Sequence, residues 1–251
     1  MQALPMRSVL VTGANRGLGL ELVRQLEEAE RPPRYLFAGC RDPESPRALD
    51  LRNLAKRFSN IKVLKLDVDD YGNIQECADQ IGKILENNGL NLLINNAGVY
   101  FGGDLSEVTP ETMMKSYRTN AVGPMMVTKA LLPALQRAAQ LSDELKKAAV
   151  INMSSSLGSM ELFDNKNEIP LAYRISKAAL NMVTKCLANE LKPHGILCIS
   201  LHPGWVKTEM GGEKAPLSKE ESVRGILKVL SMLSDKDNGS FLDWRGQRLP
   251  W

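Results

Sequence analysis

Short runs of apolar residues alternate with longer stretches in which apolar positions repeat at the helical period, along nearly the whole chain. Short apolar runs bounded by turn residues are typical of buried strands. We therefore expect strands at 8–12, 34–40, 61–66, 90–95, 149–153 and 196–201, with an edge strand at 239–244. The periodic stretches between them predict helices at 19–30, 48–58, 71–86, 109–140, 172–191 and 218–233. Because proline disrupts helices, the longest one should break near Pro124 or Pro133.

Strands that are apolar along their whole length, and that alternate with helices, indicate a parallel sheet covered on both faces. Right-handed crossovers then give an α/β fold with a single doubly wound (Rossmann) sheet. No linker-like segment interrupts the pattern, so residues 1–251 are expected to form one domain. Two polar segments, 141–147 and 161–168, are interpreted as surface loops.

The composition agrees with a soluble globular protein: 43% of the 251 residues are hydrophobic and 24% are charged. The 32 basic and 29 acidic residues nearly cancel, which predicts no nucleic-acid partner. No apolar run approaches the roughly 20 residues of a membrane span, so no membrane association is expected. The segment 1–8 is too short and polar for a secretion signal, which favours a cytoplasmic location.

Cysteine and histidine offer little material for a metal site. None of the four cysteines has a partner at metal-ligand spacing, and all are interpreted as reduced thiols: Cys40, Cys77, Cys186 and Cys198. His194 and His202 are the only two histidines. We therefore predict no metal ion and no Ser-His-Asp triad.

A glycine-rich loop, 12–19, follows the first predicted strand and opens the first helix. In this position Gly13 permits a tight turn, Gly17 lets the backbone approach a pyrophosphate, and Gly19 allows close packing of helix on sheet. The start of the helix adds free N–H groups and a positive potential. We predict a dinucleotide site contacted by Gly13, Asn15, Arg16, Gly17, Leu18 and Gly19.

The end of the second strand bears on the choice of dinucleotide. A ribose 2′-hydroxyl is usually met there by a carboxylate, and a 2′-phosphate by a cation. Here the strand ends at Cys40 and Arg41, and no acid precedes Asp42. With Arg16 in the glycine loop, this favours NADP(H). The alternative is that Arg41 is a solvated charge, partly offset by Asp42, and that Arg16 pairs elsewhere.

Tyr173 and Lys177 stand four residues apart at the start of a predicted helix, so they share one face. A nearby ammonium favours the phenolate and lowers the phenol pKa. Such a tyrosine can donate a proton to a carbonyl oxygen while a hydride reaches the carbon. Taken alone, the spacing also fits an ordinary surface pair.

Further motifs follow in a fixed order, and with them the chain resembles the short-chain dehydrogenase/reductase family. They are Asn-Asn-Ala-Gly at 95–98, Asn120 within 118–123, Ile-Asn-Met-Ser-Ser at 151–155, Tyr173 with Lys177, and His-Pro-Gly-Trp-Val-Lys-Thr at 202–208. The segments 157–159, 171–179 and 203–206 are most similar to those of Sniffer-type, C-factor-like carbonyl reductases.

The resemblance implies a catalytic set of Asn120, Ser155, Tyr173 and Lys177. Ser155 would hydrogen-bond the substrate carbonyl and Tyr173 would protonate it. Lys177 would bind the nicotinamide ribose, and Asn120 would interrupt its helix and hold a water. If the strand frays early, Ser154 or Ser156 takes the place of Ser155.

The resemblance also implies further contacts with NADP(H). They come from segments after the third, fourth and sixth strands: Asp67, Val68, Asn95, Ala97, Gly98, Pro203, Gly204, Val206 and Thr208, together with Tyr173 and Lys177. The segment 209–218, with two glycines and a proline, is interpreted as a mobile lid.

We expect NADPH-dependent reduction of a ketone, aldehyde or quinone carbonyl in a small molecule, with Tyr173 as the proton donor. Dinucleotide binding and catalysis would share the one domain. A homodimer or a homotetramer is compatible with the resemblance. Two other readings stay open: a hydroxysteroid or secondary-alcohol dehydrogenase, and a non-catalytic NADPH-sensing regulator.

Overall fold

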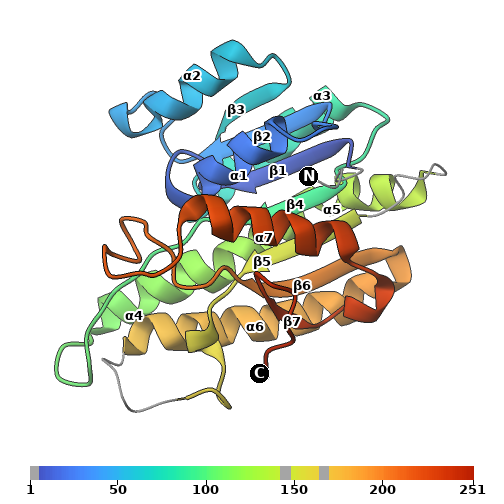
Figure 1. Ribbon diagram of the computed structural model, residues 1–251. Coiled ribbons are helices and arrows are strands. Elements are labelled where there is room, and N and C mark those ends of the chain that lie inside the picture. Colours follow the sequence, from blue (N-terminus) through green and yellow to red (C-terminus); the bar gives the residue numbers. More distant parts are fainter. Residues whose placement is uncertain (1–5, 142–147, 164–169) are drawn as a thin grey trace.

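The computed structural model describes residues 6–141, 148–163 and 170–251, and these build a seven-stranded parallel sheet (Figure 1). The order across the sheet is β3-β2-β1-β4-β5-β6-β7. The strands are β1 Ser8–Thr12, β2 Tyr35–Cys40, β3 Ile61–Lys65, β4 Leu92–Asn95, β5 Ala148–Met153, β6 Ile196–His202 and β7 Phe241–Asp243. This confirms the predicted doubly wound α/β fold.

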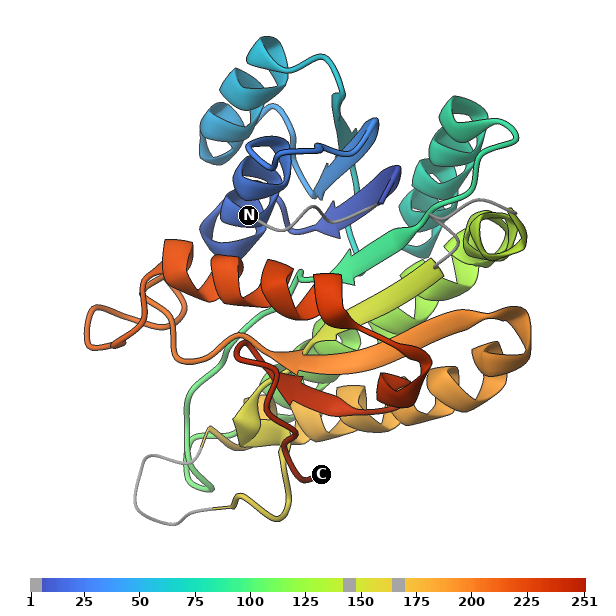
Figure 2. The same ribbon diagram turned by 45° about the vertical axis from the view of Figure 1, so that its right-hand side comes forward.

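Helices cover both faces of the sheet (Figure 2). They are α1 Gly17–Glu27, α2 Leu49–Arg57, α3 Tyr71–Leu85, α4 Pro110–Tyr117, α5 Gly123–Gln140, α6 Leu171–Leu191 and α7 Lys219–Met232. Along β1, Val9 and Val11 face a core built with α1, α2 and α7, whereas Leu10 faces a core built with α3, α5 and α6. A strand whose alternate residues are buried on opposite sides has to be apolar throughout.

The predicted long helix is interrupted before its first proline. Helix α4 ends at Tyr117, a π-helical turn spans Arg118–Val122, and α5 begins at Gly123. Pro124 lies in the first turn of α5, directly after the π turn. Pro133 lies inside α5 without ending it. The break therefore arises from the π turn, which contains Asn120.

The chain reverses its direction of winding between β1 and β4, which are neighbours in the sheet. The loops after these two strands meet at their carboxyl ends. Asn96 Nδ2 donates to the carbonyl of Thr12 at 2.9 Å, and the Ala97 N–H donates to Thr12 Oγ1 at 2.9 Å. In doubly wound sheets this switch point is where ligands bind.

The described helices include none whose length and apolar character would let it cross a membrane. Of the two predicted surface loops, 142–147 and 164–168 lie outside the described residues.

The packing of helices around the sheet can be tested at two glycines far from the switch point. A Cβ added at Gly89 would lie 1.9 Å from the backbone nitrogen of Ala138 on α5, whereas one at Gly82 on α3 would meet nothing within 4 Å. We expect Gly89→Ala to lower the free energy of unfolding by about 2 kcal/mol or more. The control Gly82→Ala should raise it by about 0.5–1 kcal/mol. Urea unfolding measures both, and equal effects would contradict the packing described.

Candidate active site

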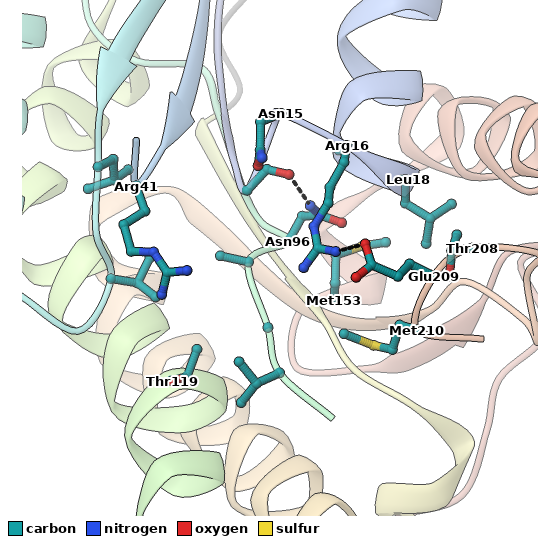
Figure 3. Close-up of a pocket in the computed structure, with 18 of the residues that line it drawn as sticks. Asn15, Arg16, Leu18, Arg41, Asn96, Thr119, Met153, Thr208, Glu209 and Met210 are labelled. Carbon is teal, nitrogen blue, oxygen red and sulfur yellow. Dashed lines mark hydrogen bonds and ion pairs between the residues drawn. The ribbon is translucent and has the colours of Figure 1, made fainter. Parts of the chain in front are cut away.

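A cleft of about 670 Å³ lies at the carboxyl ends of the strands, over the switch point (Figure 3). It brings together most of the residues that the sequence singled out. Those in its lining are Gly13, Asn15, Arg16, Gly17, Leu18, Gly19, Arg41, Asp67, Val68, Ala97, Gly98, Tyr173, Lys177, Pro203 and Thr208.

The glycine loop approaches its neighbours so closely that side chains are excluded. Gly13 has a φ of +64°, and a Cβ there would lie 2.9 Å from the Cα of Ala97. A Cβ at Gly19 would lie 2.1 Å from the carbonyl oxygen of Gly13. Helix α1 begins in this loop with no side-chain cap at Arg16, so its first N–H groups are free to bind an anion. The loop therefore fits a pyrophosphate.

Tyr173 and Lys177 lie together in the first turns of α6. The buried Lys177 Nζ donates to the carbonyl of Met153 at 2.7 Å and lies 5.6 Å from the centre of the Tyr173 ring. Burial lowers the pKa of Lys177 to about 8. Burial also raises the pKa of Tyr173 to about 12, against a smaller lowering by a hydrogen bond with Ser155. The phenol pKa thus moves opposite to the expected lowering, and at neutral pH Tyr173 carries its proton.

Of the three consecutive serines, Ser155 is the one that hydrogen-bonds the hydroxyl of Tyr173. Its Oγ also accepts from the N–H of Leu157 at 3.2 Å. Ser154 lines the cleft, but its hydroxyl donates to Asn181 Oδ1 at 2.7 Å. Ser156 begins a short 3₁₀ turn. The structure therefore places Ser155 beside Tyr173.

The buried side chain of Asn120 connects the loop after β4 to α6. Its Oδ1 accepts from the N–H of Val99 at 2.8 Å, and its Nδ2 donates to the Val99 carbonyl and to Ser176 Oγ, both at 2.9 Å. A Cβ at Gly98 would lie 3.1 Å from Asn120 Oδ1 and 3.8 Å from Lys177 Nζ. The Asn120 amide therefore links the loop after β4 to α6, beside Lys177.

Three of the predicted cofactor contacts lie outside the lining of the cleft. Asn95 is buried within the sheet, where its Nδ2 donates to Asn152 Oδ1 at 2.9 Å. Val206 is buried and pairs with Leu217 through its backbone, and Gly204 packs against Leu217. Asn95 therefore serves the packing of the strands, and its neighbour Asn96 reaches the cleft instead.

Several lining residues were not predicted: Asp42, Ser45, Arg47, Leu66, Asp69, Asn96, Val99, Thr119, Met153, Glu209 and Met210. Some are brought in by pairs between distant segments. Asp69 is held by Lys115 Nζ at 2.5 Å and by Thr119 Oγ1 at 2.9 Å. No short sequence motif predicts pairs between distant segments. The expected lid at 209–218 was the signal that could have identified Glu209 and Met210.

The two arginines that were expected to meet a 2′-phosphate differ in their contacts. Arg16 does pair, with Glu209 at the mouth of the cleft (Figure 3). Arg41 has neither an ion pair nor a hydrogen bond from its side chain to any described residue, and its guanidinium lines the cleft. Asp42 accepts from the N–H of Glu44 at 3.2 Å and forms no ion pair with Arg41.

Within the described residues, no group of three or more His, Cys, Asp or Glu side chains is placed to hold a metal ion. All four cysteines are free thiols, and three of them are buried.

A family model described as short chain dehydrogenase matches residues 7–218. The chain belongs to this family. The match confirms the family resemblance, and it shows that the protein is an oxidoreductase.

One similar protein is a bacterial signalling protein by name. The C-signal of Myxococcus xanthus is 40% identical over 163 residues, which is 64% of this chain and 93% of that protein.

Two solved structures are similar over nearly the whole chain. One is an NADPH-bound carbonyl reductase from chicken fatty liver, at 46% identity and a TM-score of 0.94, with 98% of this chain and 99% of that chain covered. The other is the carbonyl reductase Sniffer of D. melanogaster, at 41% identity and a TM-score of 0.92, with 98% and 100% covered. These relatives confirm the resemblance to Sniffer-type carbonyl reductases.

The buried Lys177 predicts how stability changes with pH. Above about pH 8 the folded protein loses the Lys177 proton, whereas the unfolded chain keeps it up to an ordinary pKa near 10.5. The unfolded state then binds more protons, so this group makes the protein more stable as pH rises from 8 toward 10.5. Relative to Lys177→Met, wild type should gain on the order of 2 kcal/mol between about pH 7.5 and 9.5.

Urea unfolding of both proteins at the two pH values measures this gain. The comparison with the variant cancels the opposite contribution of the buried thiols, whose pKa values burial raises: Cys40, Cys77 and Cys198. Identical pH dependence in the two proteins would show that Lys177 is not desolvated.

Proposed function

We propose that this protein is an NADPH-dependent carbonyl reductase acting on ketones, aldehydes or quinones. The observation that carries the proposal is one cleft lined by the glycine loop, Tyr173 and the buried Lys177, with Ser155 outside the lining but hydrogen-bonded to the Tyr173 hydroxyl. The names of the two similar carbonyl reductases support it. In this proposal residues 1–251 form a single domain for both binding and catalysis, located in the cytoplasm, and the substrate is a small molecule.

The residues present fit the dinucleotide. The N–H groups at the start of α1, which has no side-chain cap at Arg16, would receive the pyrophosphate at the glycine loop. Arg16 and Arg41 would bind the 2′-phosphate, a group that guanidinium recognises well. Thr208, across from Gly17, would hold the nicotinamide end. When bound, NADPH supplies the hydride that reduces the carbonyl carbon.

The side chains of the cleft manage the proton and the carbonyl oxygen. The Ser155 hydroxyl donates a hydrogen bond to that oxygen and stabilises its developing negative charge. Tyr173 is protonated at neutral pH, because burial raises the pKa of its phenol, and it donates this proton to the oxygen. The ammonium of Lys177, 5.6 Å from the ring centre, then stabilises the phenolate that remains. Asn120 positions the loop and helix that hold Lys177.

Removal of the Tyr173 hydroxyl tests this assignment. We expect Tyr173→Phe to lower kcat on the order of 10²- to 10⁴-fold, because it removes the proton donor. The affinity for NADPH should stay close to that of wild type, since the glycine loop and the arginines are unchanged. Consumption of NADPH with a carbonyl substrate gives kcat, and quenching of tryptophan fluorescence gives the affinity.

Tyr117→Phe is the matched control, because Tyr117 is an exposed tyrosine on α4 outside the lining of the cleft. It should leave both quantities unchanged. Wild-type turnover in Tyr173→Phe would refute the role assigned to this phenol.

A further inference from the structure

The carboxylate of Glu209 bridges two arginines at the mouth of the cleft. One carboxylate oxygen pairs with Arg16 Nη1, and the other lies 3.5 Å from Arg47 Nη2 (Figure 3 shows the first pair). The three residues come from distant segments: the glycine loop, the short 3₁₀ turn Pro46–Ala48 before α2, and the segment after β6. All three line the cleft.

The arginines around this bridge have the chemistry that suits a phosphate. Arg16 is the residue before α1, and Arg41, whose guanidinium has no ion-pair partner among the described residues, extends into the cleft from the end of β2 (Figure 3). With Arg47 they supply three guanidinium groups to the lining of the cleft. A carboxylate between two guanidiniums presents the same kind of acceptor oxygens that a phosphate presents. Glu209 therefore forms ion pairs with arginines that could also bind a phosphate.

A ligand can replace Glu209 in this bridge at a small cost in free energy. The side chains of Arg16, Arg47 and Glu209 are 48%, 67% and 63% exposed, and ion pairs at such exposure contribute little stability. The two arginines hold the pKa of Glu209 below its usual range, so the carboxylate is charged at neutral pH. A phosphate carrying about two negative charges competes well with a single exposed carboxylate.

Glu209 belongs to a segment of which other residues also line the cleft. It stands between Thr208 and Met210, which both line the cleft. The Gly211 N–H donates to Thr208 Oγ1 at 3.0 Å, and Trp205 Nε1 donates to the Gly211 carbonyl at 2.8 Å. Displacement of Glu209 would therefore also move the neighbouring residues, which border the proposed site of the nicotinamide.

We propose that Glu209 is an internal counter-ion that occupies the 2′-phosphate subsite until a 2′-phosphorylated ligand displaces it, with Arg47 as an additional cation of that subsite. An adenine nucleotide without this phosphate leaves the bridge intact. Glu209 and Arg47 are then specificity-determining residues, and release of Glu209 frees the segment 209–212. The inference rests on the proposed use of NADPH.

Calorimetric titration with adenosine 2′,5′-bisphosphate and with AMP tests the inference without turnover. Glu209→Gln should bind the bisphosphate more tightly, on the order of three- to ten-fold, because the competitor is gone, and should bind AMP like wild type. Arg47→Gln should bind the bisphosphate more weakly by a similar factor. Glu213→Gln is the matched control, since Glu213 is an exposed acid in the same segment with no ion pair in the described structure, and it should change neither affinity.

Equal effects of Glu209→Gln and Glu213→Gln, or an equal gain for AMP, would overturn the inference while the proposed function stands. If wild type binds the bisphosphate no better than AMP, the proposed NADPH preference fails together with the inference. Hydrogen exchange gives a second readout. In wild type the bisphosphate, but not AMP, should speed exchange in the peptide covering 209–212, and identical exchange with both nucleotides would contradict the release of this segment.

Discussion

Burial of one ammonium group is the constraint on which the active site depends. Lys177 is enclosed, yet among the described residues its Nζ has the Met153 carbonyl as its acceptor and no carboxylate nearby. A buried, incompletely compensated charge is costly, so the surrounding structure must hold it in place. A Cβ at Gly158 would lie 2.7 Å from the Lys177 backbone, and Gly98 and Asn120 close the other side. Small residues and a π turn make room for the one cation that the proposed chemistry requires.

The topology explains how distant segments reach that cation. Parallel strands end at the same edge of the sheet, and the winding reverses between β1 and β4, so the loops after β1, β2, β4, β5 and β6 converge. The lining of the resulting cleft includes the half-buried Tyr173 and the buried Lys177. It also includes three exposed arginines, Arg16, Arg41 and Arg47. In the proposed function, proton transfer would take place beside the buried Lys177, and phosphate recognition would take place where exposed charges can exchange partners.

Sequence periodicity and ordered motifs were enough to predict the fold and the family, because both depend on patterns that recur at fixed spacing. The family resemblance selected Ser155, but Ser154 and Ser156 stayed open as alternatives, because β5 ends at Met153 and the alternation of strand faces stops before Ser154. The motifs assigned Asn95 to the cofactor although its amide is used between strands. They also missed the bridge formed by Glu209, because ion pairs between distant segments leave no local pattern.

We propose above that NADPH, bound in this cleft, supplies a hydride to a carbonyl and that Tyr173 supplies the accompanying proton. The most direct measurement is the consumption of NADPH and of NADH by the wild-type protein with a panel of quinones, dicarbonyls, aldehydes and steroid ketones. We expect turnover on carbonyls in the panel, faster with NADPH than with NADH. Tight binding of NADPH without turnover of any carbonyl would contradict this proposal and would favour a regulatory, nucleotide-sensing protein.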